Sequence, residues 1–222
     1  MIFILAAIAA YLLGSIPFGL LIARAHGKDL RSIGSGNIGA TNVARALGRK
    51  WAYLCFLLDV LKGLIPMLLV KFEIQNSKFE ISTAVGLWLW LAVGCAAIMG
   101  HIFPIYLKFK GGKGVATSLG VAMGLWPYYT ICASLAIAIW VVVVLIWRYV
   151  SLASITASVA FPLILIFTII LRPSWDFINL WPLLIAATAI PLMVIIRHRE
   201  NIKRLITGTE NKVLKAKKQN SM

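Results

Sequence analysis

With 222 residues, of which 61% are hydrophobic and only 13% are charged, and with a mean hydropathy of +0.91, the chain falls outside the range of soluble globular domains. The composition instead predicts an all-α integral membrane protein, because a bilayer core about 30 Å thick is crossed by helices of about 20 apolar residues. Twenty-two Lys and Arg residues against seven Asp and Glu residues give a formal net charge of +15, and most of this charge must lie outside the bilayer core.

The apolar segments predict the number of membrane crossings. Residues 2–23 lack a preceding basic residue and exceed the length of a signal-peptide core, so we interpret them as a retained helix. Five further apolar segments follow, at residues 51–70, 81–103, 115–147, 152–171 and 177–196. The segment 115–147 is too long for one crossing, and the sequence WPYY at 126–129 predicts a turn that divides it into a short helix and a full one. We therefore predict seven transmembrane helices in one domain, residues 1–211, with a basic tail at 212–222.

The positions of the basic residues predict the orientation, because short cytoplasmic loops carry an excess of Lys and Arg. Most of the 22 basic residues become cytoplasmic when the chain has seven spans and its N-terminus lies outside. If 115–147 crossed only once, Arg148 and the basic tail would both lie outside, on the side opposite to the other basic loops. We therefore expect a cytoplasmic C-terminus whose charges attract anionic lipid headgroups, and no nucleic-acid partner.

Few ionisable or metal-binding side chains lie within the predicted spans. Asp59 and Lys62 are on adjacent helical turns and are expected to pair with each other, and His101 follows near the end of the third span. The three cysteines stand singly in apolar segments, without CxxC or Cys/His spacing. We therefore expect neither a disulfide nor a metal site.

The first cytoplasmic segment contains the run SGNIGATN, residues 35–42, followed by Arg45. Six of its eight residues are Gly, Ser, Asn or Thr, a density that a plain linker does not require. Such a run can turn successive backbone amides toward an anion. The residues expected to do so are Ser35, Gly36, Asn37, Gly39, Thr41 and Asn42. Thr41 or Asn42 is also expected to cap a short helix, which would place Arg45 in its first turn, where a bidentate phosphate contact is available.

The second cytoplasmic segment reads FKGGKGVAT, residues 109–117. If a helix begins near Gly114, the amides of residues 112–114 and the Lys113 ammonium would point at one anion. Gly111 and Gly112 belong to the same predicted site. The motif is not a P-loop, since the GxxxxGK[ST] spacing is absent, and taken alone a glycine cluster at a helix end is as often only a turn.

Further polar residues follow at the next two cytoplasmic segments. Ser151 is a candidate substrate contact, although small residues also serve close helix packing in membranes. His198 and Asn201 are three residues apart and would share one face of a helix that continues the last span. A histidine at a membrane boundary is more often structural, so the prediction depends on the gathering of all these residues on one side of the membrane.

Two other classes of membrane protein fit these residues less well than an enzyme that binds phosphate groups on one side of the membrane. A transporter or channel for an organic phosphate anion would also use basic residues, but here they collect on one face and do not line a path across the bilayer. An acyl-CoA-dependent acyltransferase typically carries HxxxxD, and His26, His101 and His198 are not followed by Asp at that spacing.

Three sequences, SGNIGATNVAR, FKGGKGVAT and RHRENIKRLITGTE, together resemble the three motifs of the bacterial acyl-phosphate:glycerol-3-phosphate acyltransferases, the PlsY family. The resemblance implies transfer of a fatty acyl group from acyl phosphate to the 1-hydroxyl of sn-glycerol 3-phosphate. The products would be lysophosphatidic acid and phosphate, in the first step of bacterial phospholipid synthesis. It also implies a multi-pass protein of the bacterial cytoplasmic (inner) membrane with its active site on the cytoplasmic side. No cofactor or metal is expected, and we expect a monomer.

The family's functional residues fall on matching positions of this chain. The resemblance assigns essential roles to Ser35 and Arg45, and glycerol 3-phosphate binding to the segment of Gly111, Gly112, Lys113 and Gly114. It makes His198 and Asn201 important for activity and gives Glu210 a structural role.

Acyl phosphate is already activated, so we expect direct transfer, in which Arg45 and Lys113 offset the repulsion between two phosphates. Ser35 or Asn201 would donate to the substrate oxygens, and His198 or the leaving phosphate would take the hydroxyl proton. Ser35 as a nucleophile stays the alternative, although it would need an adjacent base.

Overall fold

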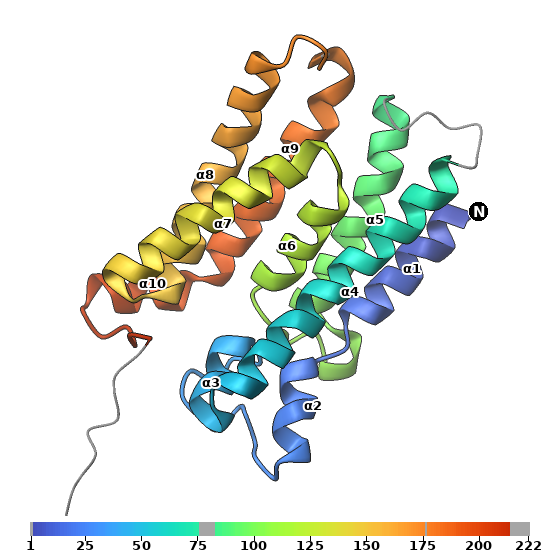
Figure 1. The fold of residues 1–222 in the computed structure, drawn as a ribbon. Coiled ribbons are helices and arrows are strands. Elements are labelled where there is room, and N and C mark those ends of the chain that lie inside the picture. Colours follow the sequence, from blue (N-terminus) through green and yellow to red (C-terminus); the bar gives the residue numbers. More distant parts are fainter. Residues whose placement is uncertain (1, 76–82, 176, 214–222) are drawn as a thin grey trace, which may run out of the picture.

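The computed structural model describes residues 2–75, 83–175 and 177–213, which fold into helices without a β-strand among them (Figure 1). Their α-helices are α1 (Ile2–Gly14), α2 (Phe18–Ala25), α3 (Ala40–Leu47), α4 (Arg49–Gln75), α5 (Ala84–Ile102), α6 (Val115–Gly124), α7 (Tyr128–Trp147), α8 (Val150–Leu171), α9 (Phe177–Arg197) and α10 (Arg199–Ile206). A short 3-10 helix, η1 (Ile105–Leu107), follows α5. The all-α membrane fold predicted from composition is therefore confirmed.

Six helical stretches of the described residues are long and apolar enough to cross a membrane. These are Ile2–Ala25, Arg49–Glu73, Ala84–Leu107, Tyr128–Trp147, Val150–Leu171 and Phe177–Arg197. The remaining predicted span, the short helix at the start of 115–147, corresponds to α6. Its 10 residues extend about 15 Å at 1.5 Å per residue, which is about half of the bilayer core. The predicted division of 115–147 is confirmed, since α6 ends at Gly124 and α7 begins at Tyr128.

The first predicted span differs from the structure in one respect. Residues 2–23 were expected to form one helix, but the chain breaks between α1 and α2 at residues 15–17. Pro17 causes the break, because proline has no amide to donate and disfavours helical geometry in the residue before it. The predicted start of the third span at residue 81 and most of the basic tail, 214–222, lie outside the described residues.

Glycines bring the central helices into backbone contact. A Cβ atom added to Gly120 of α6 would lie 2.0 Å from the carbonyl oxygen of Val60 in α4, and one added to Gly63 of α4 would lie 2.3 Å from that of Thr117. The α1–α5 contact is built in the same way, with Gly14 against Ala97. Small residues at such contacts are typical of helix packing in membranes.

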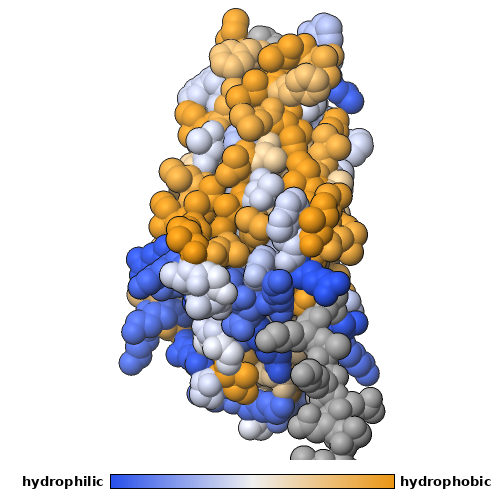
Figure 2. All heavy atoms as spheres, turned by 90° about the vertical axis from the view of Figure 1, so that its left-hand side faces the viewer, coloured by the Kyte–Doolittle hydropathy of each residue, from blue (hydrophilic) through white to orange (hydrophobic). Residues whose placement is uncertain are grey.

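Polar and apolar side chains separate along the bundle. In Figure 2 an apolar band covers the upper part of the molecule and hydrophilic side chains cover its lower end. In Figure 1 that lower end carries α2, α3 and α10. We call it the polar end. The predicted motifs lie there, beside one another although far apart in the sequence.

Candidate functional site

Asn42 organises the first loop of the polar end, which joins α2 to α3. Its side chain is buried, accepts a hydrogen bond from the Ser35 amide (3.1 Å), and donates to the carbonyl oxygens of Leu30 (3.0 Å) and Ile33 (2.9 Å). Both ends of the side-chain amide are therefore used to shape the loop. The substrate contact expected of Asn42 stays a prediction, and Ser35 is exposed.

The helix after this loop begins earlier than predicted. Gly39 is the N-terminal flanking residue of α3 and the side-chain oxygen of Asn37 accepts a hydrogen bond from the Gly39 amide (2.9 Å). Thr41 and Asn42 therefore lie inside α3 and do not cap it, and Arg45 lies in its last turn, not its first. The turn made by Asn37 starts the helix before the two residues that the sequence suggested as caps.

Arg45 nevertheless lies against the loop. A Cβ atom added to Gly34 would lie 3.2 Å from Cδ of Arg45 and 2.5 Å from the side-chain oxygen of Asn42. Gly34 has a φ of +59°, in the left-handed region that favours glycine. The Arg45 side chain thus packs beside Gly34, which directly precedes the run 35–42.

In the second loop, Gly111 and Gly112 pack on the end of α5. Their amides donate to the carbonyl oxygens of Ile102 (3.2 Å) and His101 (3.0 Å), and their own carbonyl oxygens accept from Arg197 (3.3 Å each). The predicted convergence of the amides of 112–114 on an anion is therefore wrong for Gly112. A Cβ atom on Gly111 would lie 2.2 Å from the His101 carbonyl oxygen, so close packing explains the glycine.

The end of the same loop has free backbone donors. Helix α6 begins directly after Gly114, as predicted, and Gly114 has a φ of +86°. No acceptor for the amides of Lys113 and Gly114 is found among the described residues. These two amides, at the N-terminus of a helix, remain able to bind an anion.

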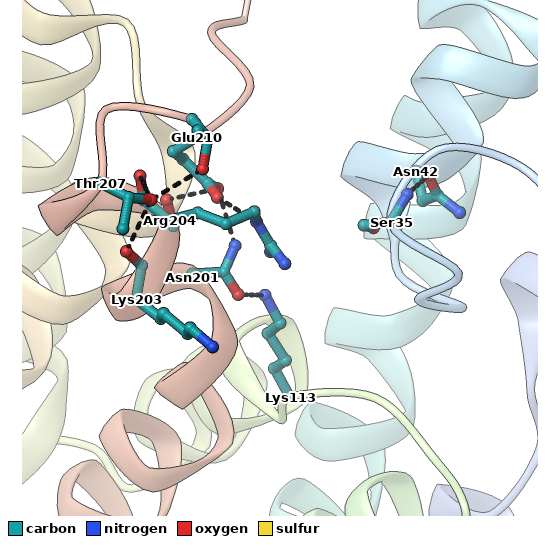
Figure 3. Close-up of polar contacts among 10 residues, drawn as sticks. Ser35, Asn42, Lys113, Asn201, Lys203, Arg204, Thr207 and Glu210 are labelled. Atoms are coloured by element: carbon teal, nitrogen blue, oxygen red, sulfur yellow. Dashed lines mark hydrogen bonds and ion pairs between the residues drawn. The ribbon is translucent and has the colours of Figure 1, made fainter.

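Lys113 joins a hydrogen-bonded network with residues from the C-terminal part of the chain (Figure 3). Its ammonium donates to the side-chain oxygen of Asn201, and the Asn201 nitrogen donates to Oε1 of Glu210 (2.7 Å). Glu210 Oε1 also accepts from the Ser151 hydroxyl (2.8 Å), and its Oε2 accepts from Nε of Arg204 (2.7 Å). We call these five residues the Lys113 network. The Ser151 hydroxyl donates inside this network, and its expected role as a direct substrate contact stays a prediction.

Basic side chains exceed carboxylates in and around the network. Burial is the main cause that lowers the pKa of the Lys113 ammonium to about 8. The Glu210 carboxylate opposes this shift, whereas Arg204 and Arg45 add to it. Burial also lowers the pKa of Arg45, on which Glu210 and Arg204 act electrostatically. The first loop and the Lys113 network therefore share one positive field, which favours an anionic ligand.

Glu210 is the only carboxylate of the network. Burial by itself would raise its pKa, but hydrogen bonds from Arg204, Asn201 and Ser151 together hold the pKa below its usual value. Glu210 is therefore ionised at neutral pH and orients its three donors.

His198, at the start of α10, is buried, with 3% of its surface exposed. Its Nδ1 lies 2.7 Å from the carbonyl oxygen of Val194, so Nδ1 carries the proton and donates. Burial first, and the nearby Lys113 ammonium second, lower the pKa of His198 to about 4. The ring is therefore neutral at pH 7, and Nε2, which has no partner among the described residues, can accept a hydrogen bond.

The structure brings most of the predicted residues to one side of the polar end. Figure 3 shows Ser35, on the loop between α2 and α3, across from the Lys113 network. Sequence reasoning missed Arg197 and Arg204, because both were counted among the basic residues that orient the chain. Arg204 stands three residues after Asn201, a spacing that places two side chains on one helix face and could have indicated it.

The sequence and the fold are similar to those of known proteins. The profile of the family described as glycerol-3-phosphate acyltransferase matches residues 4–208. A glycerol-3-phosphate acyltransferase of Geotalea daltonii is 47% identical over 204 residues, 92% of this chain and 94% of the relative. One of Aquifex aeolicus is 45% identical over 207 residues, 92% and 96% of the two chains.

Two crystal structures of PlsY (YgiH), an integral membrane glycerol 3-phosphate acyltransferase, are also similar. The glycerol 3-phosphate form has a TM-score of 0.82 and the lysophosphatidic acid form one of 0.80. Each is 42% identical in sequence, and the match covers 96% of both chains.

Proposed function

The chain belongs to the glycerol-3-phosphate acyltransferase family, and we propose that its acyl donor is acyl phosphate. It would transfer the acyl group to the 1-hydroxyl of sn-glycerol 3-phosphate and release lysophosphatidic acid and phosphate. The observation that carries the proposal is the positive field shared by Arg45, Lys113 and Arg204, which contains one carboxylate. Both substrates bear a phosphate, and an excess of positive charge is needed to hold them together.

In the proposed reaction the hydroxyl oxygen of glycerol 3-phosphate attacks the acyl carbon directly. The bond between the acyl carbon and the phosphate oxygen breaks, and its electron pair leaves with phosphate. The Lys113 ammonium and the Arg45 guanidinium stabilise the charge that develops there. Asn201 orients Lys113, since its side-chain oxygen accepts from that ammonium and its nitrogen donates to Glu210.

The hydroxyl proton passes to the departing phosphate in this mechanism. His198, with a pKa of about 4, is a weak base at neutral pH. We assign its Nε2 the role of accepting a hydrogen bond from the attacking hydroxyl and so orienting it. Ser35 has no basic side chain bonded to its hydroxyl among the described residues, so we assign it hydrogen-bond donation and not nucleophilic attack.

Contacts at the polar end support seven passes of the chain. Lys113 bonds Asn201, and the Gly112 carbonyl oxygen accepts from Arg197, so the segments before α6 and after α9 lie at the same end. The chain between them must therefore cross an even number of times. Helices α7, α8 and α9 supply three crossings, and we propose that α6 with residues 125–127 supplies the fourth.

The same reasoning extends to the location of the protein. We propose that the N-terminus lies outside and that the polar end faces the cytoplasm of a bacterial inner membrane, as the excess of basic residues in the motif loops favours. A monomer is sufficient, because one chain supplies every residue of the proposed site.

The proposal is tested with purified protein in detergent, given glycerol 3-phosphate and either acyl phosphate or acyl-CoA. We expect lysophosphatidic acid and phosphate from acyl phosphate alone. Lys113→Ala should lower turnover by about 100-fold or more, as for removal of a group that stabilises developing charge. Lys110→Ala is the matched control, an exposed lysine of the same loop, and should retain turnover within about twofold.

Two results would contradict the proposal. Turnover with acyl-CoA and none with acyl phosphate would exclude the proposed donor. Isolation of a labelled acyl-enzyme after incubation with labelled acyl phosphate alone would exclude direct transfer and return Ser35 to the role of nucleophile.

A further inference from the structure

A second charged cluster lies inside the bundle, separate from the Lys113 network. Asp59 and Lys62 of α4 and His101 of α5 are 3%, 2% and 6% exposed. Nζ of Lys62 lies 2.6 Å from Oδ1 of Asp59, which confirms the pair expected from the sequence, and Nδ1 of His101 lies 3.7 Å from the same oxygen. Buried charges are costly, and apolar side chains of similar volume would pack the helices at least as well. The cluster therefore calls for an explanation beyond packing.

One side of the cluster supports the loop that carries Lys113. A Cβ atom added to Gly112 would lie 2.1 Å from Nε2 of His101, so the loop rests directly on the edge of the ring. The Gly112 amide also donates to the His101 carbonyl oxygen (3.0 Å). Lys113 is the next residue, and its position depends on where the His101 ring is held.

The other side of the cluster supports the first loop. The thiol of Cys55 lies 3.8 Å from Oδ2 of Asp59 and acts as a weak donor to it. A Cβ atom added to Gly19 of α2 would lie 3.1 Å from that sulfur and 2.0 Å from the carbonyl oxygen of Ile38. Ile38, which is buried in the run 35–42, thus contacts Gly19, and Gly19 contacts Cys55. Cys55 in turn contacts Asp59.

Lys62 links the cluster to the break between α1 and α2. Its ammonium donates to the carbonyl oxygen of Ile16 (3.0 Å) and lies 5.6 Å from the centre of the Phe18 ring. This carbonyl group stands at the break, where helix ends leave backbone oxygens without helical partners. From this point the chain turns into α2 and then into the first loop.

We propose that Asp59, together with Lys62 and His101, is a positioning residue that holds the Ser35–Arg45 side and the Lys113 side of the site in register. The Asp59 carboxylate lies beside Cys55, which supports the first loop, and beside His101, which supports the loop of Lys113. The proposal rests on the function proposed above, because it takes both loops to contact the substrates. A substrate held by both loops loses reactivity when it is misplaced by about 1 Å.

The test compares Asp59→Asn, Lys62→Met and the double variant. Each single variant leaves one buried charge without its partner and is expected to be less stable, whereas the double variant removes both charges and should recover the melting temperature. If the cluster sets the register, the folded double variant still loses about 10- to 100-fold in kcat/KM. Calorimetric binding of glycerol 3-phosphate to it should weaken in parallel.

Thr168→Val is the matched control, because it removes a buried polar group of α8 whose hydroxyl donates within its own helix (2.7 Å to Ile164). It should leave kcat, KM and binding unchanged. A double variant that melts like the wild type and keeps wild-type kcat and KM would overturn the proposal. If the double variant does not fold, His101→Gln replaces it, because this change removes the ring beneath Gly112 without introducing a charge. A folded His101→Gln variant with wild-type kcat and KM would overturn the proposal.

The experiment also separates this inference from the proposed function. Absence of turnover by the wild-type protein with acyl phosphate would refute the proposed donor. Calorimetric binding of glycerol 3-phosphate does not require the donor, and an unchanged affinity in the folded Asp59/Lys62 double variant would then refute the positioning role by itself.

Discussion

At the scale of single residues, burial brings the ionisation of the Lys113 ammonium near physiological pH. Its pKa is lowered to about 8, so it loses its charge as pH rises through that value. We predict that kcat/KM, which reports ionisation of the free enzyme, falls on the alkaline side with a midpoint near pH 8. Lys113→Arg keeps its charge at any accessible pH and should carry the residual activity to higher pH.

Rate measurements between pH 6 and pH 10 in one detergent test this prediction. Lys110→Arg serves as the control, because the side chain of Lys110 is exposed and its replacement should leave the alkaline midpoint in place. The same alkaline midpoint in Lys113→Arg as in the wild type would assign the ionisation to another group.

Glu210 provides the second prediction at this scale. The folded-state pKa of Glu210 is lowered, so its contribution to stability is present above its ordinary pKa and is lost as pH falls through the folded value. Glu210→Gln replaces charge-assisted hydrogen bonds and should cost about 1.5–3 kcal/mol at pH 7, whereas Ser151→Ala should cost about 1 kcal/mol. Thermal unfolding in detergent at pH 7 and at pH 4 measures both. If Glu210→Gln lowered the stability by the same amount at pH 4 as at pH 7, the ionic role of Glu210 would be contradicted.

At the scale of helices, the α4–α6 contact sets where the Lys113 loop ends, because α6 begins directly after Gly114. Gly120→Ala would place a Cβ atom 2.0 Å from the Val60 carbonyl oxygen and should force the two helices apart, at a cost of about 1–3 kcal/mol. Ser118→Ala in the same helix is the control. The Ser118 hydroxyl is buried without a hydrogen-bond partner among the described residues, so its removal should not lower the melting temperature. Equal melting temperatures for the Gly120→Ala and Ser118→Ala variants would refute the contact.

The helices also show which features could be predicted from the sequence. Hydrophobic length and the aromatic turn at 126–129 predicted the division between α6 and α7, because both signals are local. The close contacts of Gly111 and Gly112 with α5 could not be predicted, since they depend on which helix end lies beneath the loop. The hydrogen bonds by which Asn42 shapes the first loop could not be predicted for the same reason, because its acceptors lie 9 and 12 residues earlier in the chain.

At the scale of the whole molecule, the sidedness of the polar end is the remaining prediction. Single cysteines at Lys108 and Lys203, both exposed at this end, should react with a membrane-impermeant maleimide only after cells are permeabilised. A cysteine at Ser174, in the loop between α8 and α9, should react in intact cells. The wild-type protein is the control, because its three cysteines lie within membrane helices.

The pair at Lys108 and Lys203 also tests the number of crossings. If residues 115–147 crossed the membrane once, these two cysteines would lie on opposite sides and would be labelled under opposite conditions. That arrangement would separate Lys113 from Asn201, whose side chains are hydrogen-bonded, and would divide the proposed site between two compartments. Labelling of both cysteines from the same side is therefore required for the site to exist, and the side on which it occurs decides whether glycerol 3-phosphate reaches the site from the cytoplasm.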